Sequence, residues 1–342
     1  MNSRQSDAPS GLIILNKRAQ LTSFDSLAEI KRVLGTGKVG HTGTLDKFAH
    51  GLLLVLTGRA LKLSPWFSGC DKQYEATVRF GIETDTLDPE GAPVAGAELP
   101  SLNALVQALP QFTGAIMQAP PEYSAIHIDG KRASALARSG QTPEMRKRMV
   151  HIYRLELRDW QPPLAKIAVH CSSGTYIRSL ARDIALAVDS RAHLSALCRT
   201  QVAGFKLGNG EWGVGNGDRG SGIGEWGVGS GELGNGGMGI GDRGIGNGGL
   251  SSLLPIDKNV FRLLGIPWFE ITGGELPAVM QGKPLEGILS GRRLLGDGLY
   301  APPDGGTGQA AQAAAVFCGD SLAAVIEKTP HSWKYGYVYA HT

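Results

Sequence analysis

The chain has 342 residues, of which 42% are hydrophobic, and a formal net charge of +3 at pH 7. This length suggests about two domains on a prior of roughly 100–200 residues per domain, and the apolar content excludes a disordered or collagen-like chain. No stretch approaches the roughly 18 consecutive apolar residues of a membrane span, and the N-terminus has neither an apolar signal region nor an Arg-rich transit pattern. We therefore expect a cytoplasmic globular protein that does not contact membranes.

Residues 11–207 are predicted to alternate short strands and helices. The stretch GLIILNK (11–17) is typical of a strand. Residues 23–35 predict a helix with Thr22 or Ser23 as its N-cap and Gly35 at its end. The apolar face of that helix consists of Leu27, Ile30 and Leu34.

Three more strands are predicted at 52–58, 74–82 and 166–171. The last of them turns at Ser173 and Gly174 into an expected helix over 175–188, which carries an unbroken apolar stripe. Tyr176 and Arg178 should therefore lie at the start of a helix, just past the end of a strand.

Acidic residues in two stretches could carry chemistry. Asp46 ends the loop GHTGTLD (40–46), and taken alone it is most simply a turn former or an N-cap. Asp85 and Asp88 in TDTLDPEG (84–91) could suggest a metal site, but the surrounding Thr, Pro and Gly residues favour an Asx-type turn.

The chain has four cysteines: Cys70, Cys171, Cys198 and Cys318. They form no C-x-x-C pair, so we expect neither a zinc site nor disulfides and interpret them as buried or idle thiols.

Charge is distributed unevenly along the chain. Residues 1–207 carry 25 Lys and Arg against 18 Asp and Glu, whereas 208–342 carry 9 against 13. The strongest basic concentration runs from Lys131 to Arg158, with eight basic residues opposed by Glu144 and Glu156. The stretch is either a solvated helical face or a phosphate-binding surface.

The segment 208–249 differs in kind, because 20 of its 42 residues are glycine. Its G-x-G-x-x-G at 208–213 neither follows a βαβ strand nor opens a helix, so it is not a dinucleotide-binding motif. We interpret the segment as a flexible insertion, with weak RNA contact through Trp212 and Trp226 as the alternative.

Ordinary composition resumes at about residue 251. The stretch 314–328 predicts a hairpin that turns at Gly319 and Asp320. The stretch 333–341 (WKYGYVYAH) predicts a strand with Trp333, Tyr335, Tyr337 and Tyr339 on one face. A small β-rich C-terminal part is expected.

Five segments, at 38–63, 72–91, 112–140, 169–185 and 192–205, together resemble the TruB family of bacterial tRNA pseudouridine-55 synthases, in the family's order and spacing. Five ordered motifs are far more specific than any single pattern. The resemblance implies a pseudouridine-synthase α/β (α+β) fold, with a mixed, largely antiparallel sheet, flanking helices and a small C-terminal β-rich domain of the PUA kind.

The resemblance also implies catalytic roles. Asp46 matches the family's nucleophilic aspartate, which attacks the target uridine. Tyr74 matches the tyrosine that stacks on the flipped base and is implicated in proton removal. Arg178 matches the arginine that pairs with the catalytic carboxylate. A close arginine would keep a buried carboxylate ionised, which fits that pairing.

Three further positions match substrate-binding residues. Tyr176 and Leu197 match residues that line the base pocket, and His41 matches the histidine that fills the place of the extruded base. The family's RNA-clasping insertion, with its basic helix, would cover about 120–158. The phosphate-binding interpretation of this stretch then gains weight, with RNA-backbone contacts expected from Lys131, Arg132, Arg146, Lys147 and Arg148.

Some positions depart from the family. The usual Pro after the catalytic Asp is Lys47, the usual Thr or Cys before the following Gly is His50, and the usual Lys-Pro near the N-terminus is Lys17-Arg18. Loss of the Pro loosens the backbone beside the nucleophile. The glycine-rich insertion is the largest departure.

The expected organisation is a catalytic core over 11–207, the insertion over 208–249, the end of the catalytic domain over 250–264, and the PUA-like domain over 265–342. We expect a monomeric isomerase that converts uridine-55 in the T-stem-loop of tRNA to pseudouridine, without metal or cofactor, and with an accompanying tRNA-folding role. The alternatives are a synthase for another RNA stem-loop and a catalytically idle RNA-binding or tRNA-folding protein.

Overall fold

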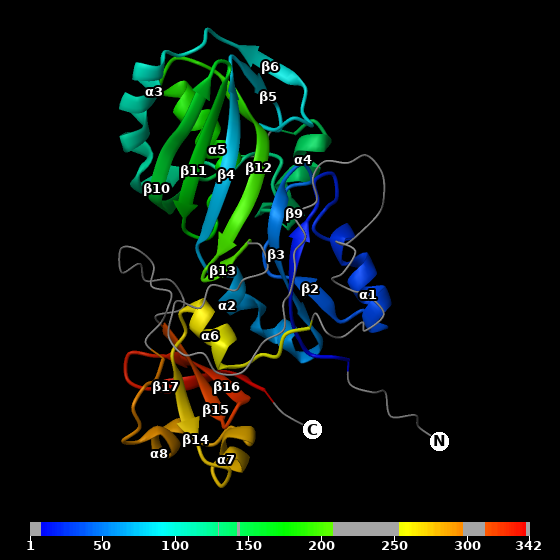
Figure 1. Ribbon diagram of the computed structural model, residues 1–342, viewed down its shortest axis with the longest axis vertical. Helices are drawn as coiled ribbons and strands as arrows, with labels where there is room; N and C mark the ends of the chain where they lie inside the picture. Colours follow the sequence, from blue (N-terminus) through cyan, green and yellow to red (C-terminus); the bar gives the residue numbers. More distant parts are fainter. Residues whose placement is uncertain (1–7, 129, 142–143, 208–252, 297–311, 340–342) are drawn as a thin grey trace. The chain divides into compact units, whose positions relative to one another are not determined.

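The computed structural model describes residues 8–128, 130–141, 144–207, 253–296 and 312–339 (Figure 1). The predicted glycine-rich insertion at 208–249 lies outside the described residues. The chain divides into two compact units, each described below by itself. Unit 1 consists of residues 1–47, 51–70 and 201–342, and unit 2 consists of residues 48–50 and 71–200.

The N-terminal part of unit 1 is built on two antiparallel strands. Strand β1 (Gly11–Lys17) pairs with β3 (His50–Thr57), with Gly11 opposite Thr57 and Lys17 opposite Gly51. Strand β2 (Val39–His41) also pairs with β3. The ladder confirms the strands predicted at 11–17 and 52–58, and the apolar run of β3 is almost completely buried.

The predicted helix forms as a 3₁₀ turn, η1 (Asp25–Leu27), followed by α1 (Ala28–Leu34). Of the two expected caps, Thr22 acts at this end: its Oγ1 accepts the Asp25 N–H at 3.0 Å and donates to the Asp25 carboxylate at 2.6 Å. Gly35 ends the helix with φ of 61°, a conformation that favours glycine. Leu27 and Ile30, on the predicted apolar face of this helix, are buried.

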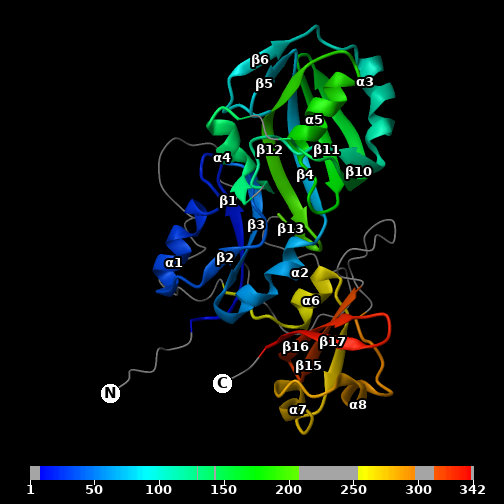
Figure 2. The same ribbon diagram turned by 180° about the vertical axis from the view of Figure 1, so that it is seen from behind.

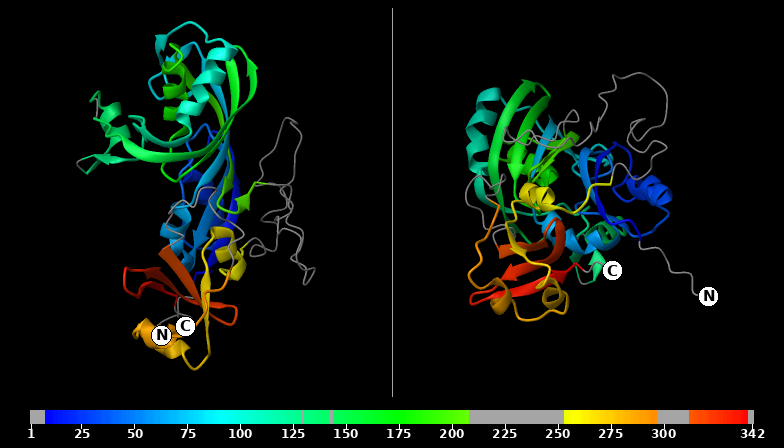
Figure 3. Two further views of the ribbon diagram at one scale, coloured as in Figure 1. Left: turned by 90° about the vertical axis from the view of Figure 1, so that its left-hand side faces the viewer. Right: turned by 60° about the horizontal axis from the view of Figure 1, so that its bottom comes forward.

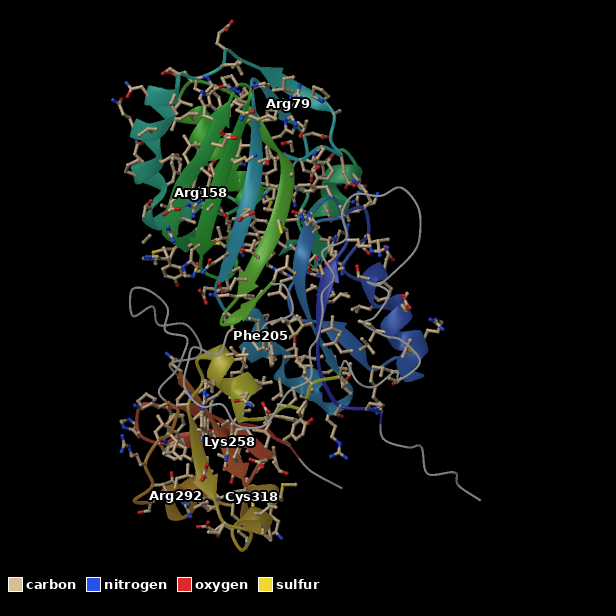
Figure 4. All side chains as sticks on the ribbon, viewed as in Figure 1. Arg79, Arg158, Phe205, Lys258, Arg292 and Cys318 are labelled. Atoms are coloured by element: carbon tan, nitrogen blue, oxygen red, sulfur yellow. The ribbon has the colours of Figure 1, made fainter. Side chains whose placement is uncertain are left out.

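The remainder of unit 1 packs in part on a core that it shares with β1 and β3, called the shared core. It contains η2 (Gly58–Leu63), α2 (Ser64–Ser68), β13 (Phe205–Lys206) and α6 (Lys258–Leu264). Its sheet has the strand order β14 (Trp268–Ile271), β15 (Ala313–Cys318), β16 (Ser321–Lys328) and β17 (Trp333–Val338). Strands β15 and β16 form the predicted hairpin around Gly319. Phe205, labelled in Figure 4, is fully buried and stacks on Phe67.

The prediction that four aromatic residues share one face of β17 is wrong. Tyr335 lies opposite Ile326, but Tyr337 lies opposite Val325, because the ladder contains a bulge between these pairs. A bulge adds one residue to one strand and so switches the face of everything after it. Trp333 and Tyr335 therefore pack with α7 (Leu276–Met280) and α8 (Leu285–Leu289), whereas Tyr337 and Tyr339 join the shared core.

Unit 2 is a twisted, mainly antiparallel sheet. Its strand order is β12 (Ala192–Val202, in unit 2 to Thr200), β4 (Lys72–Phe80), β11 (Leu164–Cys171), β10 (Arg148–Gln161) and β7 (Gly114–Gln118). Helix α5 (Ile177–Leu186) packs on one face of this sheet (Figure 2). Side chains alternate along β4, with Tyr74 and Val78 buried and Arg79, labelled in Figure 4, exposed.

Smaller elements complete unit 2. Helix α3 (Leu102–Ala108) continues into η3 (Leu109–Phe112), and β5 (Ile82–Thr84) pairs with β6 (Pro93–Gly96). The hairpin β8 (His127–Ile128) and β9 (Lys131–Arg132) leads into α4 (Ala133–Arg138). In the left view of Figure 3 this hairpin and α4 extend away from the sheet.

The predicted fold class is confirmed, since a mixed, mainly antiparallel sheet has helices packed on it and the C-terminal part is rich in strands. Within the described ranges, none of the helices has the length and hydropathy needed to span a membrane.

Candidate functional site

The loop that carries Asp46 is fixed by hydrogen bonds on its N-terminal side. Thr42 donates its backbone N–H to the carbonyl of Leu54 on β3, at 3.0 Å. The buried hydroxyl of Ser23 accepts the Leu45 N–H at 2.9 Å and donates to the Leu45 carbonyl at 3.1 Å. Both backbone groups of the residue before Asp46 are therefore satisfied by one side chain.

The C-terminal side of the loop is fixed as well. The carbonyl of Lys47 accepts the backbone N–H of Gln20 at 2.8 Å and the ammonium of Lys17 at 3.4 Å. Lys17 is only 1% exposed, whereas the Lys47 side chain is exposed. Asp46, itself half-buried, is thus held between two anchored neighbours. Lys47, which replaces the expected Pro, contributes through its carbonyl, a group that Pro also possesses.

Unit 2 carries the predicted base-pocket residues on strands and at a helix start. Tyr74 is buried on β4, opposite Val169 of β11. Leu197 is buried on β12. Tyr176 is the N-cap residue of α5, which confirms the predicted helix start. Gln118, at the end of β7, bonds both backbone groups of Tyr176.

Arg178 lies in the first turn of α5 and is 4% exposed. Its Nη1 donates to the Thr86 carbonyl at 2.8 Å, and its Nη2 donates to the Tyr123 carbonyl at 3.0 Å. The guanidinium therefore ties the loop after β5 to the segment that follows β7.

Asp88 is a partner of Arg178 that the sequence did not reveal. Its Oδ2 lies 3.4 Å from Arg178 Nη1, and both side chains are almost fully buried. Its Oδ1 accepts the Glu90 N–H at 3.0 Å and the Thr86 hydroxyl at 2.6 Å, which confirms the predicted Asx-type turn. A buried carboxylate needs such a cation, but no periodicity in the sequence pairs two residues that far apart.

The predicted residues fall into two groups. His41, half-buried on β2, and Asp46 belong to unit 1, whereas Tyr74, Tyr176, Arg178 and Leu197 belong to unit 2. Within unit 2 the start of α5 brings Tyr176 and Arg178 together. The pairing of Arg178 with Asp46, implied by the resemblance, stays a prediction.

Comparison with known proteins decides the family. The model of the TruB family pseudouridylate synthase N-terminal domain matches residues 31–177. A tRNA pseudouridine synthase B of Borreliella burgdorferi is 45% identical over 200 residues, which are 58% of this chain and 71% of the relative. The chain belongs to the TruB family of pseudouridylate synthases. A second relative, the tRNA pseudouridine synthase B of Treponema denticola, is 47% identical over 216 residues, and this chain spans only 60% of its length.

Solved structures match the TruB-family chain over nearly its whole length. An H/ACA RNP bound to a substrate RNA containing 2′-deoxyuridine includes a chain with a TM-score of 0.63 and 20% identity, covering 97% of this chain and 85% of that one. A Cbf5-Nop10-Gar1 complex gives 0.62 and 22%, covering 96% and 82%. At this identity the likeness supports the fold alone.

The basic segment of this TruB-family chain is arranged differently from the prediction. Only Arg138 of its eight basic residues lies on a helix, because α4 spans just six residues. Lys131 and Arg132 are exposed on β9, and Arg146 and Lys147 are exposed in the segment before β10. Turn-forming glycines and the long strand β10 interrupt the helical pattern, so the expected basic helix is wrong. Arg148 begins β10 and donates to the Gly174 carbonyl.

The described residues hold no group of three or more His, Cys, Asp or Glu side chains arranged as metal ligands. The titratable groups around Arg178 have their own partners: the Tyr123 hydroxyl donates to Asp85 at 3.4 Å, and burial followed by the Asp85 charge raises the pKa of Tyr123.

Proposed function

We propose that this chain is a tRNA pseudouridine synthase that isomerises uridine-55 of the T-loop, acting as a monomer in the cytoplasm. The observation that carries the proposal is the anchored loop around Asp46, which presents a carboxylate between two fixed backbone positions. A loop fixed in this way suits a nucleophile that must meet one atom of a substrate. The names of the two relatives support tRNA as the substrate.

In the proposed reaction Asp46 attacks the target nucleotide, and the glycosidic bond between C1′ and N1 breaks. The detached uracil turns, C5 bonds to C1′, and the bond that Asp46 formed to the nucleotide breaks, which returns the free carboxylate. The C5 proton is then lost and N1 gains a proton, so that atoms and electrons balance without an oxidant or a leaving product. The reaction asks for a nucleophile, a pocket and a proton acceptor, all of which side chains supply.

The roles of the other residues follow from the same proposal. A base in a folded loop must leave its stack, at a cost of a few kcal/mol, and be held against an aromatic face. Tyr74 and Tyr176 are the proposed faces, Leu197 is the proposed apolar wall, and His41 is proposed to occupy the place of the flipped base. Arg178 is proposed to keep the catalytic carboxylate ionised. Support for this last role is that Arg178 is already fixed by two carbonyls and Asp88.

Phosphate contacts are proposed for the exposed basic residues on and near the hairpin β8–β9, namely Lys131, Arg132, Arg146 and Lys147. Their exposure leaves them accessible to RNA. Affinity for tRNA should then fall steeply as salt rises, because bound phosphates release counterions. A salt-independent affinity would contradict this part of the proposal.

The proposal is tested by a pseudouridine assay on an unmodified T-stem-loop transcript. The wild type should modify the loop. Asp46→Asn should bind it with unchanged affinity but lose about 10³-fold or more of the rate, as expected when a nucleophile is removed. Asp189→Asn is the matched control, since Asp189 is exposed and its φ of 53° suits Asn.

The same assay separates the alternatives. If the wild type modifies another stem-loop from total RNA but not the T-loop, the enzyme has a different substrate. If the wild type and Asp46→Asn bind RNA equally and neither forms pseudouridine in any RNA, the chain is an RNA-binding or tRNA-folding protein and the proposed activity is wrong.

A further inference from the structure

One buried side chain of the sheet forms hydrogen bonds with the turn that carries Tyr176. Gln118 is 1% exposed and lies at the last position of β7. Its Oε1 accepts the Tyr176 N–H at 2.8 Å, and its Nε2 donates to the Tyr176 carbonyl at 3.1 Å. One amide side chain thus satisfies both backbone groups of an N-cap residue, because it carries a donor and an acceptor side by side.

A second side chain, on the neighbouring strand β10, contacts the same turn. The Arg148 guanidinium lies 5.0 Å from the centre of the Tyr176 ring and donates to the Gly174 carbonyl. Gly174 has φ of 82°, and a Cβ there would lie 3.5 Å from the guanidinium. That separation is an ordinary van der Waals contact, so it is the positive φ of the turn that favours glycine here.

Gln118 and Arg148 are direct cross-strand neighbours in the ladder between β7 and β10. The chain leaves the sheet at Gln118 and returns to it at Arg148. The residues between them, 119–147, include β8, β9, α4 and most of the eight basic residues of the segment 131–158. The pair therefore lies where both ends of this basic excursion join the sheet, and both members contact the turn of Tyr176.

We infer that Gln118 and Arg148 form a clamp that positions Tyr176, and that Arg148 acts on the aromatic ring rather than on an RNA phosphate. The inference rests on the proposed function, because it assigns the clamp to the base pocket of that activity. RNA bound to the excursion at 119–147 lies on the segment whose two ends join the sheet at Gln118 and Arg148. The clamp therefore connects the excursion to the Tyr176 turn and fixes the position of the ring in the RNA-bound state.

The test compares Gln118→Met, which keeps size but removes both hydrogen bonds, with Gln118→Glu, which keeps only the acceptor. Single-turnover rates at saturating T-stem-loop should fall by about 10- to 100-fold for Gln118→Met, in line with the cost of a misplacement near 1 Å. Gln118→Glu should lie between it and the wild type. The dissociation constant of the RNA should change less than twofold.

A matched control separates positioning from stability. Gln201 is also a buried glutamine, but its amide donates to the Ala203 carbonyl in unit 1. Gln201→Met should lower the melting temperature without slowing the single-turnover step. In a Tyr176→Ala background, Gln118→Met should cause no further loss of rate, since its effect passes through Tyr176. A further loss there, or a full rate in the single variant, would overturn the inference.

Arg148 is tested against its exposed neighbour Arg146. Arg146→Met should reduce the magnitude of the slope of log affinity against log salt by about one, as for a lost phosphate contact. Arg148→Met should lower the rate and leave the slope unchanged; the reverse pattern would make Arg148 a phosphate ligand and contradict the clamp.

Hydrogen exchange at the Tyr176 amide, which should accelerate in Gln118→Met, reports on the clamp even if the wild type proves inactive on tRNA. Failure of the clamp and failure of the proposed function are therefore distinguishable.

Discussion

At the scale of single residues, Ser23 is the side chain on which the Asp46 loop depends most. Its hydroxyl is the buried partner of both the N–H and the carbonyl of Leu45. Ser23→Ala should lower the free energy of unfolding by about 1–3 kcal/mol, the range for buried groups left without a partner. It should also slow pseudouridine formation, because Asp46 follows Leu45 directly. Denaturant unfolding and the T-stem-loop assay measure the two effects. Ser26→Ala, three residues along and bonded at an exposed position, should stay within about 0.5 kcal/mol of the wild type, and an equal loss in both variants would contradict the assignment.

At the scale of elements, α7 begins with a hydrogen-bonded carboxylate. The Thr272 N–H, the Thr272 hydroxyl and then Arg292 all donate to Glu275, and together they lower the pKa of Glu275 to about 2. A lowered folded-state pKa adds stability that is fully present above the unfolded pKa of about 4.3 and is lost as pH falls toward 2. The melting temperature of Glu275→Gln should therefore lie below that of the wild type at pH 7, and the gap should close between about pH 4 and pH 2. A constant gap for Glu275→Gln would rule out the ionised carboxylate as its source.

Whether an element could be predicted from the sequence depends on whether neighbouring or distant residues determine it. Strong local patterns gave β1, β3, β4, β11, α5 and the hairpin of β15 and β16, because alternation and helical stripes need only neighbouring residues. The bulge that separates Tyr335 from Tyr337 and the partners of Asp88 and Gln118 depend on residues from other strands, so no local pattern contains them. The catalytic roles of Asp46, Tyr74 and Arg178 rest only on the family resemblance and stay predictions. The charge run at 131–158 was visible, but its division among a hairpin, a short helix and a strand was not.

At the scale of the whole molecule, the C-terminal strands share one core with the N-terminal part of unit 1. The buried residues of this core include members from both ends of the chain: Leu12, Leu54, Trp66, Phe67, Phe205, Phe261, Trp268, Phe317 and Val325. The predicted boundary at residue 265 stays a prediction, but a shared core should make unit 1 unfold in a single step.

Phe67→Ala and Phe317→Ala should each remove about 3–5 kcal/mol from that same unfolding step, since both rings are almost completely buried. Cys70, just after α2, and Cys318, at the end of β15, provide local probes by their rate of thiol labelling in denaturant. Both thiols should become reactive at one denaturant concentration in the wild type, and both variants should lower that concentration for both thiols together. Phe24→Ala is the control, because Phe24 is 66% exposed and its loss should move neither transition. If Phe317→Ala shifts only the labelling of Cys318, the C-terminal strands fold as an independent domain, and the shared apolar contacts contribute little to holding the two parts together.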